Sequence, residues 1–161
     1  MSKSILIEGL PASGKTVSLR NLPPKETFWI NADGKFGAWK GFDKWSDIGQ
    51  FGFDIVDAAN NMRDDLVVIL VGHTSVNDEG YENLVVNGRK LEKIQLPAYI
   101  SVVILARHED DKYKYVLRGD GCSARVPFGY FDGIDEIDND IMLVLQELEW
   151  VKKTVDKTEK V

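Results

Sequence analysis

The sequence predicts an α/β fold whose mostly parallel sheet is extended by antiparallel hairpins. Apolar runs with the length of buried strands alternate with amphipathic segments in the first half of the chain. A glycine-rich segment, residues 9–16, separates the first strand from the first helix. In the second half, short alternating runs flank tight-turn sequences such as Asn87-Gly88, which is the pattern of β-hairpins.

The first half is expected to contain a strand, a helix, a strand, a helix and a strand, in that order. The expected ranges are a strand at residues 4–9 (SILIEG), a helix at 15–22, a strand at 27–31 (TFWIN), a helix at 43–62 and a strand at 65–73 (DLVVILVGH). Pro23-Pro24 end the first helix because proline cannot continue it. The second helix has apolar side chains on one face. The unbroken apolar run of the last strand is typical of a central parallel strand.

The second half is expected to contain two hairpins and a closing helix. The first hairpin covers residues 82–94, and the second joins strands at 99–107 and 112–119. An amphipathic helix follows at residues 140–151 (DIMLVLQELEWV). One domain is therefore expected over residues 1–150, with residues 151–161 as a frayed, charged tail.

The glycine-rich segment has the spacing G-x-x-x-x-G-K-T. In such a loop the backbone N–H groups wrap a polyphosphate, Lys15 reaches the β- and γ-phosphates, and the Thr16 hydroxyl ligates Mg²⁺. Glycines permit a positive φ and leave room near the anion, and the helix that follows points its N-terminus at the phosphates. The alternative is a chance glycine-rich turn. The pattern predicts that ATP and Mg²⁺ bind to the loop residues Gly9, Leu10, Pro11, Ala12, Ser13, Gly14, Lys15 and Thr16.

Length, charge and composition narrow the classes of protein to which the chain can belong. A length of 161 residues fits one domain, and a net charge of −6 argues against a strongly basic nucleic-acid binder, although a local basic loop is compatible with it. Cys122, the single cysteine, excludes an internal disulfide and fits a reducing cytoplasm. No apolar run approaches the ~18–20 residues of a membrane span. A cytoplasmic protein with no membrane partner is expected.

Three segments resemble a family of bacteriophage-encoded ATP-binding proteins. They are residues 24–35 (PKETFWINADGK), 42–75 and 125–144 (RVPFGYFDGIDEIDNDIMLV). These relatives are RecA-like P-loop ATPases, often grouped with phage recombination and single-strand-annealing mediators. The resemblance covers nearly the whole chain from residue 3 to about residue 150. It implies an ATPase of phage DNA metabolism that assembles on single-stranded DNA as a homo-oligomer with shared sites.

One departure from the family concerns the metal site. Members carry another strand and helix before the segment equivalent to residues 43–62, and that strand ends in the Walker B aspartate, which holds Mg²⁺ through water. Here Trp39-Lys40-Gly41 leads directly into Phe42-Asp43, so the junction falls near residues 38–42. A natural or engineered deletion and a minimal variant of the family are both possible explanations of this junction. The expected RecA-like sheet is therefore shortened by one strand and one helix.

The shortened sheet has a specific expected order. The strand at 4–9 is central and is flanked by the strands at 65–73 and 99–107. The missing strand belongs between the 65–73 strand and the 27–31 strand. Without it, the 27–31 strand either pairs directly with the 65–73 strand or stands apart.

The resemblance also suggests three catalytic side chains besides Lys15. Asp33 follows the strand at 27–31, where RecA-like enzymes place a carboxylate that positions the attacking water; the alternative is a simple turn. His73 ends its strand at the edge where open α/β sheets bind ligands and resembles a γ-phosphate sensor, or it caps a loop. Arg125, rather than Arg118, matches the basic residue that a neighbouring subunit supplies.

Three functions remain open from the sequence. The first is the phage ATPase, which would hydrolyse ATP slowly because the metal-binding aspartate is missing. The second is a nucleotide-binding protein that does not hydrolyse ATP. The third is a small-molecule kinase, although no arginine-rich lid is present. The aromatic residues of segment 35–45 either stack on DNA bases or cover the shortened sheet.

Overall fold

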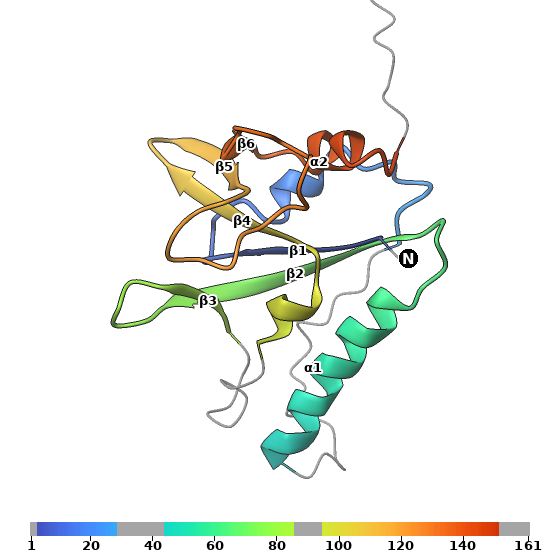
Figure 1. Cartoon of the computed structure of the whole chain (residues 1–161), viewed down its shortest axis with the longest axis vertical. Helices are drawn as coiled ribbons and strands as arrows, with labels where there is room; N and C mark the ends of the chain where they lie inside the picture. Colours follow the sequence, from blue (N-terminus) through green and yellow to red (C-terminus); the bar gives the residue numbers. More distant parts are fainter. Residues whose placement is uncertain (1–2, 29–43, 86–94, 152–161) are drawn as a thin grey trace, which may run out of the picture.

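A computed structural model of the chain describes residues 3–28, 44–85 and 95–151, and these form an α/β structure (Figure 1). Its helices and strands are β1 (Lys3–Gly9), η1 (Val17–Leu19), α1 (Lys44–Asn60), β2 (Val67–Val76), β3 (Glu82–Leu84), η3 (Leu96–Tyr99), β4 (Val102–Glu109), β5 (Lys112–Val116), β6 (Glu136–Asp138) and α2 (Ile141–Glu147). The η elements are short 3₁₀ helices. No helix in these ranges combines the length and apolar character needed to cross a bilayer.

The strands form one six-stranded sheet in the order β3-β2-β1-β4-β5-β6. Strand β1 lies between β2 and β4 and is parallel to both, which confirms the predicted centre of the sheet. The expectation of a mostly parallel sheet is wrong, because the other three pairings between described strands are antiparallel. A parallel partner needs a crossover of about a dozen residues or more, whereas β4 and β5 are joined by a tight turn.

The register brings specific residues to one edge of the sheet. Lys3 pairs with Val67 at one end of β1, and Gly9 pairs with His73 at the other. On the opposite side of β1, Glu8 is level with Leu105 of β4. The carboxyl ends of all three parallel strands therefore lie together at the edge where the glycine-rich loop begins.

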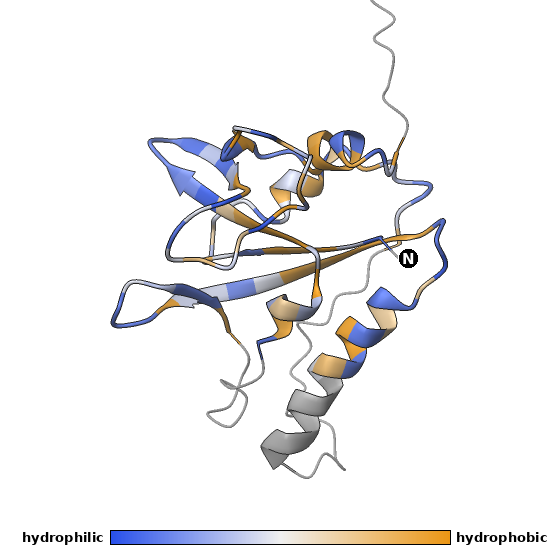
Figure 2. Ribbon diagram, in the orientation of Figure 1, coloured by the Kyte–Doolittle hydropathy of each residue, from blue (hydrophilic) through white to orange (hydrophobic). Residues whose placement is uncertain are grey.

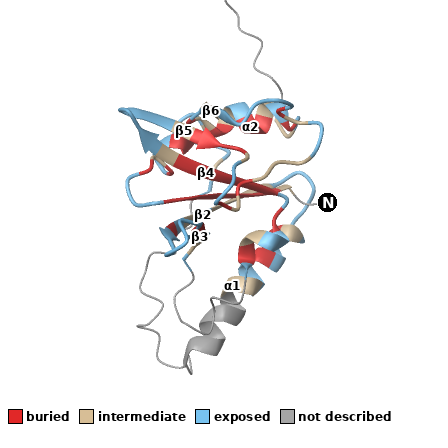
Figure 3. Ribbon diagram, turned by 60° about the vertical axis from the view of Figure 1, so that its left-hand side comes forward, coloured by how far each residue is buried: buried red, intermediate tan, exposed pale blue. Residues whose placement is uncertain are grey.

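Strand β1 is buried on both faces, which explains its unbroken apolar run. Ile5 and Ile7 pack in a cluster with residues of η1 and α2, such as Leu19 and Ile141. Leu6 points to the other face and packs with residues of α1 and η3. Figure 2 shows the apolar core along the central strands, and Figure 3 shows β4 buried along most of its length. Each such side chain contributes about 1.5–3 kcal/mol by leaving water.

The predicted helix at residues 15–22 is wrong, because only Val17–Leu19 form a 3₁₀ turn. Ser18 N–H makes one four-residue bond to Gly14 O, but the next two bonds span three residues: Leu19 N–H donates to Thr16 O and Arg20 N–H to Val17 O. The Ser18 hydroxyl donates to the Lys15 carbonyl and so competes for an oxygen that a continuing helix would use. Together with the following prolines, these local bonds keep the segment to a single turn.

The other two predicted helices are confirmed with shorter ends. Helix α1 covers Lys44–Asn60 of the expected 43–62. Helix α2 begins after Asp140, whose side chain accepts a hydrogen bond from Met142 N–H as an N-cap. It ends before Glu149, which has a left-handed φ of 57°, and Trp150 N–H then donates back to Leu145 O.

The hairpin formed by β4 and β5 is confirmed. Its two turn residues, Asp110 and Asp111, have φ values of 50° and 59°, as a type I′ turn requires. Strand β6 was not expected. Thr27 and Phe28 are not in a strand. The rest of the expected 27–31 strand, the turn at Asn87-Gly88, the junction at 38–42, most of segment 35–45 and nearly all of the tail lie outside the described residues.

Candidate functional site

The glycine-rich loop curls back on itself between β1 and η1. Ala12 and Gly14 have positive φ values of 61° and 88°, and Ser13 N–H donates to Leu10 O at 3.2 Å. A Cβ on Gly9 would lie 2.5 Å from the Ala106 carbonyl oxygen and from Ser13 Oγ. A Cβ on Gly14 would lie 2.5 Å from Cδ1 of Tyr113. Both glycines are therefore required by close packing, and Gly14 also by its backbone conformation.

The amides that follow the curl are available to an anion. The N–H groups of Gly14, Lys15 and Thr16 donate to no acceptor among the residues that the structure describes. Thr16, at the end of the loop, is exposed. Successive unpaired N–H groups at a tight turn form a concave site for anions, and phosphate oxygens are suitable acceptors for them.

Lys15 lies on the inner side of this loop and is only 7% exposed. Its ammonium donates to the carbonyl oxygens of Gly9 and Leu10 at 2.8 Å and 2.7 Å, and to Ser13 Oγ at 3.4 Å. These acceptors match the three donors of an ammonium group. Burial lowers the pKa of Lys15, and the negative charge of Glu82 partly opposes that shift. To bind a phosphate, Lys15 must exchange at least one loop oxygen for a phosphate oxygen.

The other predicted site residues do not all lie at the loop in the part of the chain that the structure describes. His73 is exposed and its backbone is level with Gly9, so it lies at the same edge of the sheet. Asp33 lies outside the described residues. The guanidinium of Arg125 donates to the carbonyl oxygens of Pro97 and Ile100, the latter at 2.7 Å.

Both candidate arginines are held within their own chain. Besides its guanidinium contacts, Arg125 exchanges two backbone hydrogen bonds with Val103 of β4. Arg118 donates from both terminal nitrogens to carbonyl oxygens of the segment 130–134. In this conformation each arginine stabilises a loop. Neither contact requires a neighbouring subunit.

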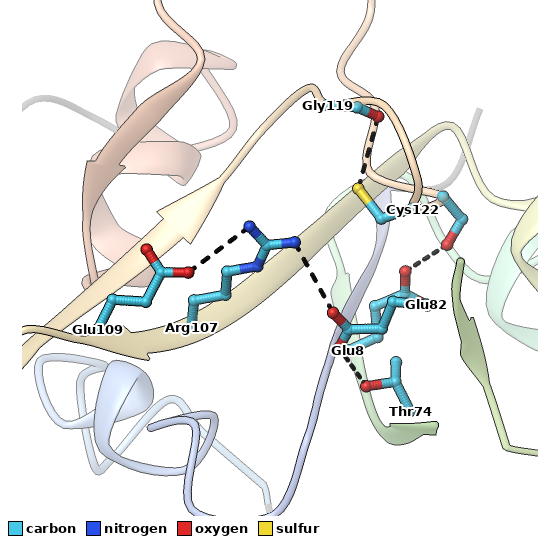
Figure 4. A network of polar contacts seen from close by, with 8 residues as sticks. Glu8, Thr74, Glu82, Arg107, Glu109, Gly119 and Cys122 are labelled. Carbon is cyan, nitrogen blue, oxygen red and sulfur yellow. Dashed lines mark hydrogen bonds and ion pairs between the residues drawn. The ribbon is translucent and has the colours of Figure 1, made fainter. Parts of the chain in front are cut away.

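An acidic pair, Glu8 and Glu82, lies beside the loop and was missed by sequence reasoning (Figure 4). Glu8 is fully buried at the end of β1; Ser123 donates a hydrogen bond to its Oε1, while Oε2 has no hydrogen-bond partner in the described structure. Glu82 accepts from the Thr74 hydroxyl, and its Oε2 lies 3.9 Å from Nη2 of Arg107.

Electrostatics link this acidic pair to the loop. Burial raises the pKa of Glu8, and the charge of Glu82 adds to that shift, whereas Ser123 and Arg125 oppose it. Glu82 also acts on the pKa of Lys15. A signal for Glu8 was present, since it is the one charged residue in the buried run before Gly9. No feature of the sequence around Glu82 indicated that it would lie near Glu8 and the loop.

The donor set fits a polyphosphate better than it fits a free metal ion. Within the described ranges, no group of three or more His, Cys, Asp or Glu side chains is placed to hold a metal. Mg²⁺ is commonly held in nucleotide sites by few protein oxygens, with phosphates and waters completing the shell. Thr16, which is exposed, can supply one such oxygen from its hydroxyl. Mg²⁺ is therefore compatible with this loop as a companion of a bound nucleotide.

The chain was compared with protein-family models, with curated proteins and with solved structures, and none of them matches it. The function of the chain is therefore inferred from the loop itself and from the residues around it.

Proposed function

We propose that this chain is a RecA-like P-loop protein of the bacteriophage type and that its loop at residues 9–16 binds ATP with Mg²⁺. The observation that carries the proposal is the combination of unpaired amides at Gly14, Lys15 and Thr16 with the ammonium of Lys15 on the inner side of the same loop. Backbone amides and an ammonium on one tight loop are the donors that a triphosphate needs.

The position of the loop in the sheet supports the proposal. Open α/β sheets bind their ligands outside the carboxyl ends of parallel strands. The loop leaves β1 at that edge, between the parallel neighbours β2 and β4. In a RecA-like arrangement β2 is the strand that carries the γ-phosphate sensor, a role we assign to His73. Asp33 is the proposed water-positioning carboxylate, and a homo-oligomer on single-stranded DNA is the proposed assembly.

We expect ATP to bind measurably and to turn over slowly. Mg²⁺ needs about six oxygens in near-octahedral geometry. Thr16 and the phosphates supply part of this set, and loss of a carboxylate that orients the metal waters typically costs about 10- to 100-fold in affinity or activity. Turnover is therefore expected below the usual enzyme range of ~1–10³ s⁻¹.

Calorimetric titration with ATP and Mg²⁺, run beside a phosphate-release assay with and without single-stranded DNA, tests this expectation. Saturable binding with slow release is the expected result. Inserting a strand that ends in Asp between residues 38 and 42 should raise turnover much more than affinity. A turnover within the ordinary enzyme range in the unchanged chain, abolished by Asp33→Ala, would show that the missing aspartate is dispensable.

A nucleotide-binding protein without hydrolysis is the second candidate, and the contacts of Arg125 favour it. Its guanidinium is engaged by the carbonyls of Pro97 and Ile100, so it must leave both to reach a neighbouring site. Leaving them gives up two hydrogen bonds from a charged donor, each worth about 1.5–3 kcal/mol. The same assay separates the candidates, since this one predicts ATP binding with no phosphate release under any condition.

A further inference from the structure

Two aromatic side chains form a stack at the end of the β4–β5 hairpin. His108 and Tyr113 are paired across the two strands, and their rings lie 4.2 Å apart between centroids at an interplanar angle of 15°. His108 is exposed and Tyr113 is 42% exposed. An exposed pair of stacked rings offers a flat apolar surface to a ligand.

This aromatic stack touches the glycine-rich loop. The ring of Tyr113 fills the space into which a Cβ on Gly14 would project, 2.5 Å from that position. Tyr115, two positions further along β5, is buried in the core that contains Leu19 of η1, so Tyr113 projects from the same face of the sheet. The position of Tyr113 on β5 therefore directs its ring toward Gly14.

The stack and the loop also lie at the same end of the sheet. Strand β4 is parallel to β1, so the hairpin that continues from β4 extends past the edge where the loop begins (Figure 1). His73 of β2 lies on the other side of β1. The loop is thus flanked by the proposed sensor on one side and by the aromatic stack on the other.

From this geometry we infer that His108 and Tyr113 form the stacking surface for the base of the bound nucleoside triphosphate. The inference rests on the proposed function. With the phosphates held by the amides from Gly14 onward, the ribose and base extend out of the loop toward the side of the ring stack that faces away from Gly14. Stacking does not read hydrogen-bonding edges, because every base has a π-face. ATP and GTP are therefore expected to bind with similar affinity.

The competing explanation is that Tyr113 only supports Gly14. Inorganic tripolyphosphate with Mg²⁺ distinguishes the two, because it has the phosphates of ATP and no base. A supporting role predicts that loss of the ring weakens both ligands equally. A base-stacking role predicts that only ATP is weakened.

The experiment titrates the full chain and its variants with each ligand by calorimetry. His108→Ala and Tyr113→Ala should weaken ATP by about 5- to 150-fold, the range of base–aromatic stacking, and leave tripolyphosphate binding unchanged. Tyr113→Phe keeps the ring and should keep the ATP affinity. Tyr99→Ala is the matched control, because Tyr99 is 55% exposed and precedes β4 at the opposite edge of the sheet.

Each remaining outcome contradicts a stated part of the account. Equal weakening of both ligands, or no weakening of ATP in either alanine variant, overturns the base-stacking inference and leaves the proposed function intact. Failure of the unchanged chain to bind either ligand overturns the proposed function together with the inference. His108→Ala removes an exposed ring and guards against a folding defect in Tyr113→Ala, and the thermal midpoint of every variant is compared with that of the unchanged chain.

Discussion

Replacing Lys15 by alanine is expected to weaken ATP binding by about 10- to 150-fold, the range for loss of a hydrogen bond to a charged group. The ammonium already lies among the loop oxygens of Gly9 and Leu10, 2.8 Å and 2.7 Å away. It therefore needs only a local exchange of partners to meet a phosphate. Calorimetric titration of the variant with ATP and Mg²⁺ measures the loss.

The matched control for this change is Lys114→Ala. Lys114 lies on β5 and donates to Glu136 at 3.1 Å, so its removal takes away the same charge from the exterior of the sheet. The control should retain the ATP affinity. The thermal midpoint of both variants shows whether the loop oxygens left by Lys15 destabilise the fold. Unchanged ATP affinity in a folded Lys15→Ala variant would mean that the loop is not the nucleotide site.

The Glu8→Gln variant is expected to be more stable than the unchanged chain at alkaline pH, by about 1–3 kcal/mol, the cost of a buried group without its partner. Burial raises the pKa of Glu8 above its ordinary value of 4.5, so the folded state holds this proton more tightly than the unfolded state. Stability from this group is complete below about pH 4.5 and is lost as the pH rises through the raised pKa. Glutamine keeps an acceptor for Ser123 and has no proton to lose.

Urea unfolding followed by tryptophan fluorescence, at a series of pH values from acidic to alkaline, measures this effect. The unchanged chain should lose stability over the window that begins near pH 4.5, and Glu8→Gln should lose less. Glu79→Gln is the control, because Glu79 is exposed between β2 and β3. Equal pH dependence in the unchanged chain and in Glu8→Gln would contradict the raised pKa of Glu8.

The features that the sequence predicted well have strong local signals. Strand β1 and its loop combine an apolar run with a fixed glycine spacing, and two aspartates at positive φ make the β4–β5 turn. Helices α1 and α2 have apolar faces. In each of these elements, residues close in sequence determine the conformation.

The features that were missed depend on contacts between distant residues. Strand β3 lies in the segment that was expected to form a hairpin, but its pairing with β2 was not predicted, and β6 was not predicted at all. Each has only three residues and depends on its partner strand, β2 or β5. The parallel character of the sheet was overestimated for the same reason. The two members of the acidic pair lie at the end of β1 and at the start of β3, and the local sequence gives no sign that Glu82 approaches Glu8. The loop donors were predictable, but the inward bonds of Lys15 to Gly9 and Leu10 were not.

Backbone amide NMR of the isotopically labelled full chain, titrated with ATP and Mg²⁺, tests the central claim most directly. The account predicts that the amide signals of Gly14, Lys15 and Thr16 show the largest changes and that they saturate together, because these N–H groups exchange water for phosphate oxygens. Saturable changes confined to other parts of the chain, with the three loop amides unmoved, would contradict it.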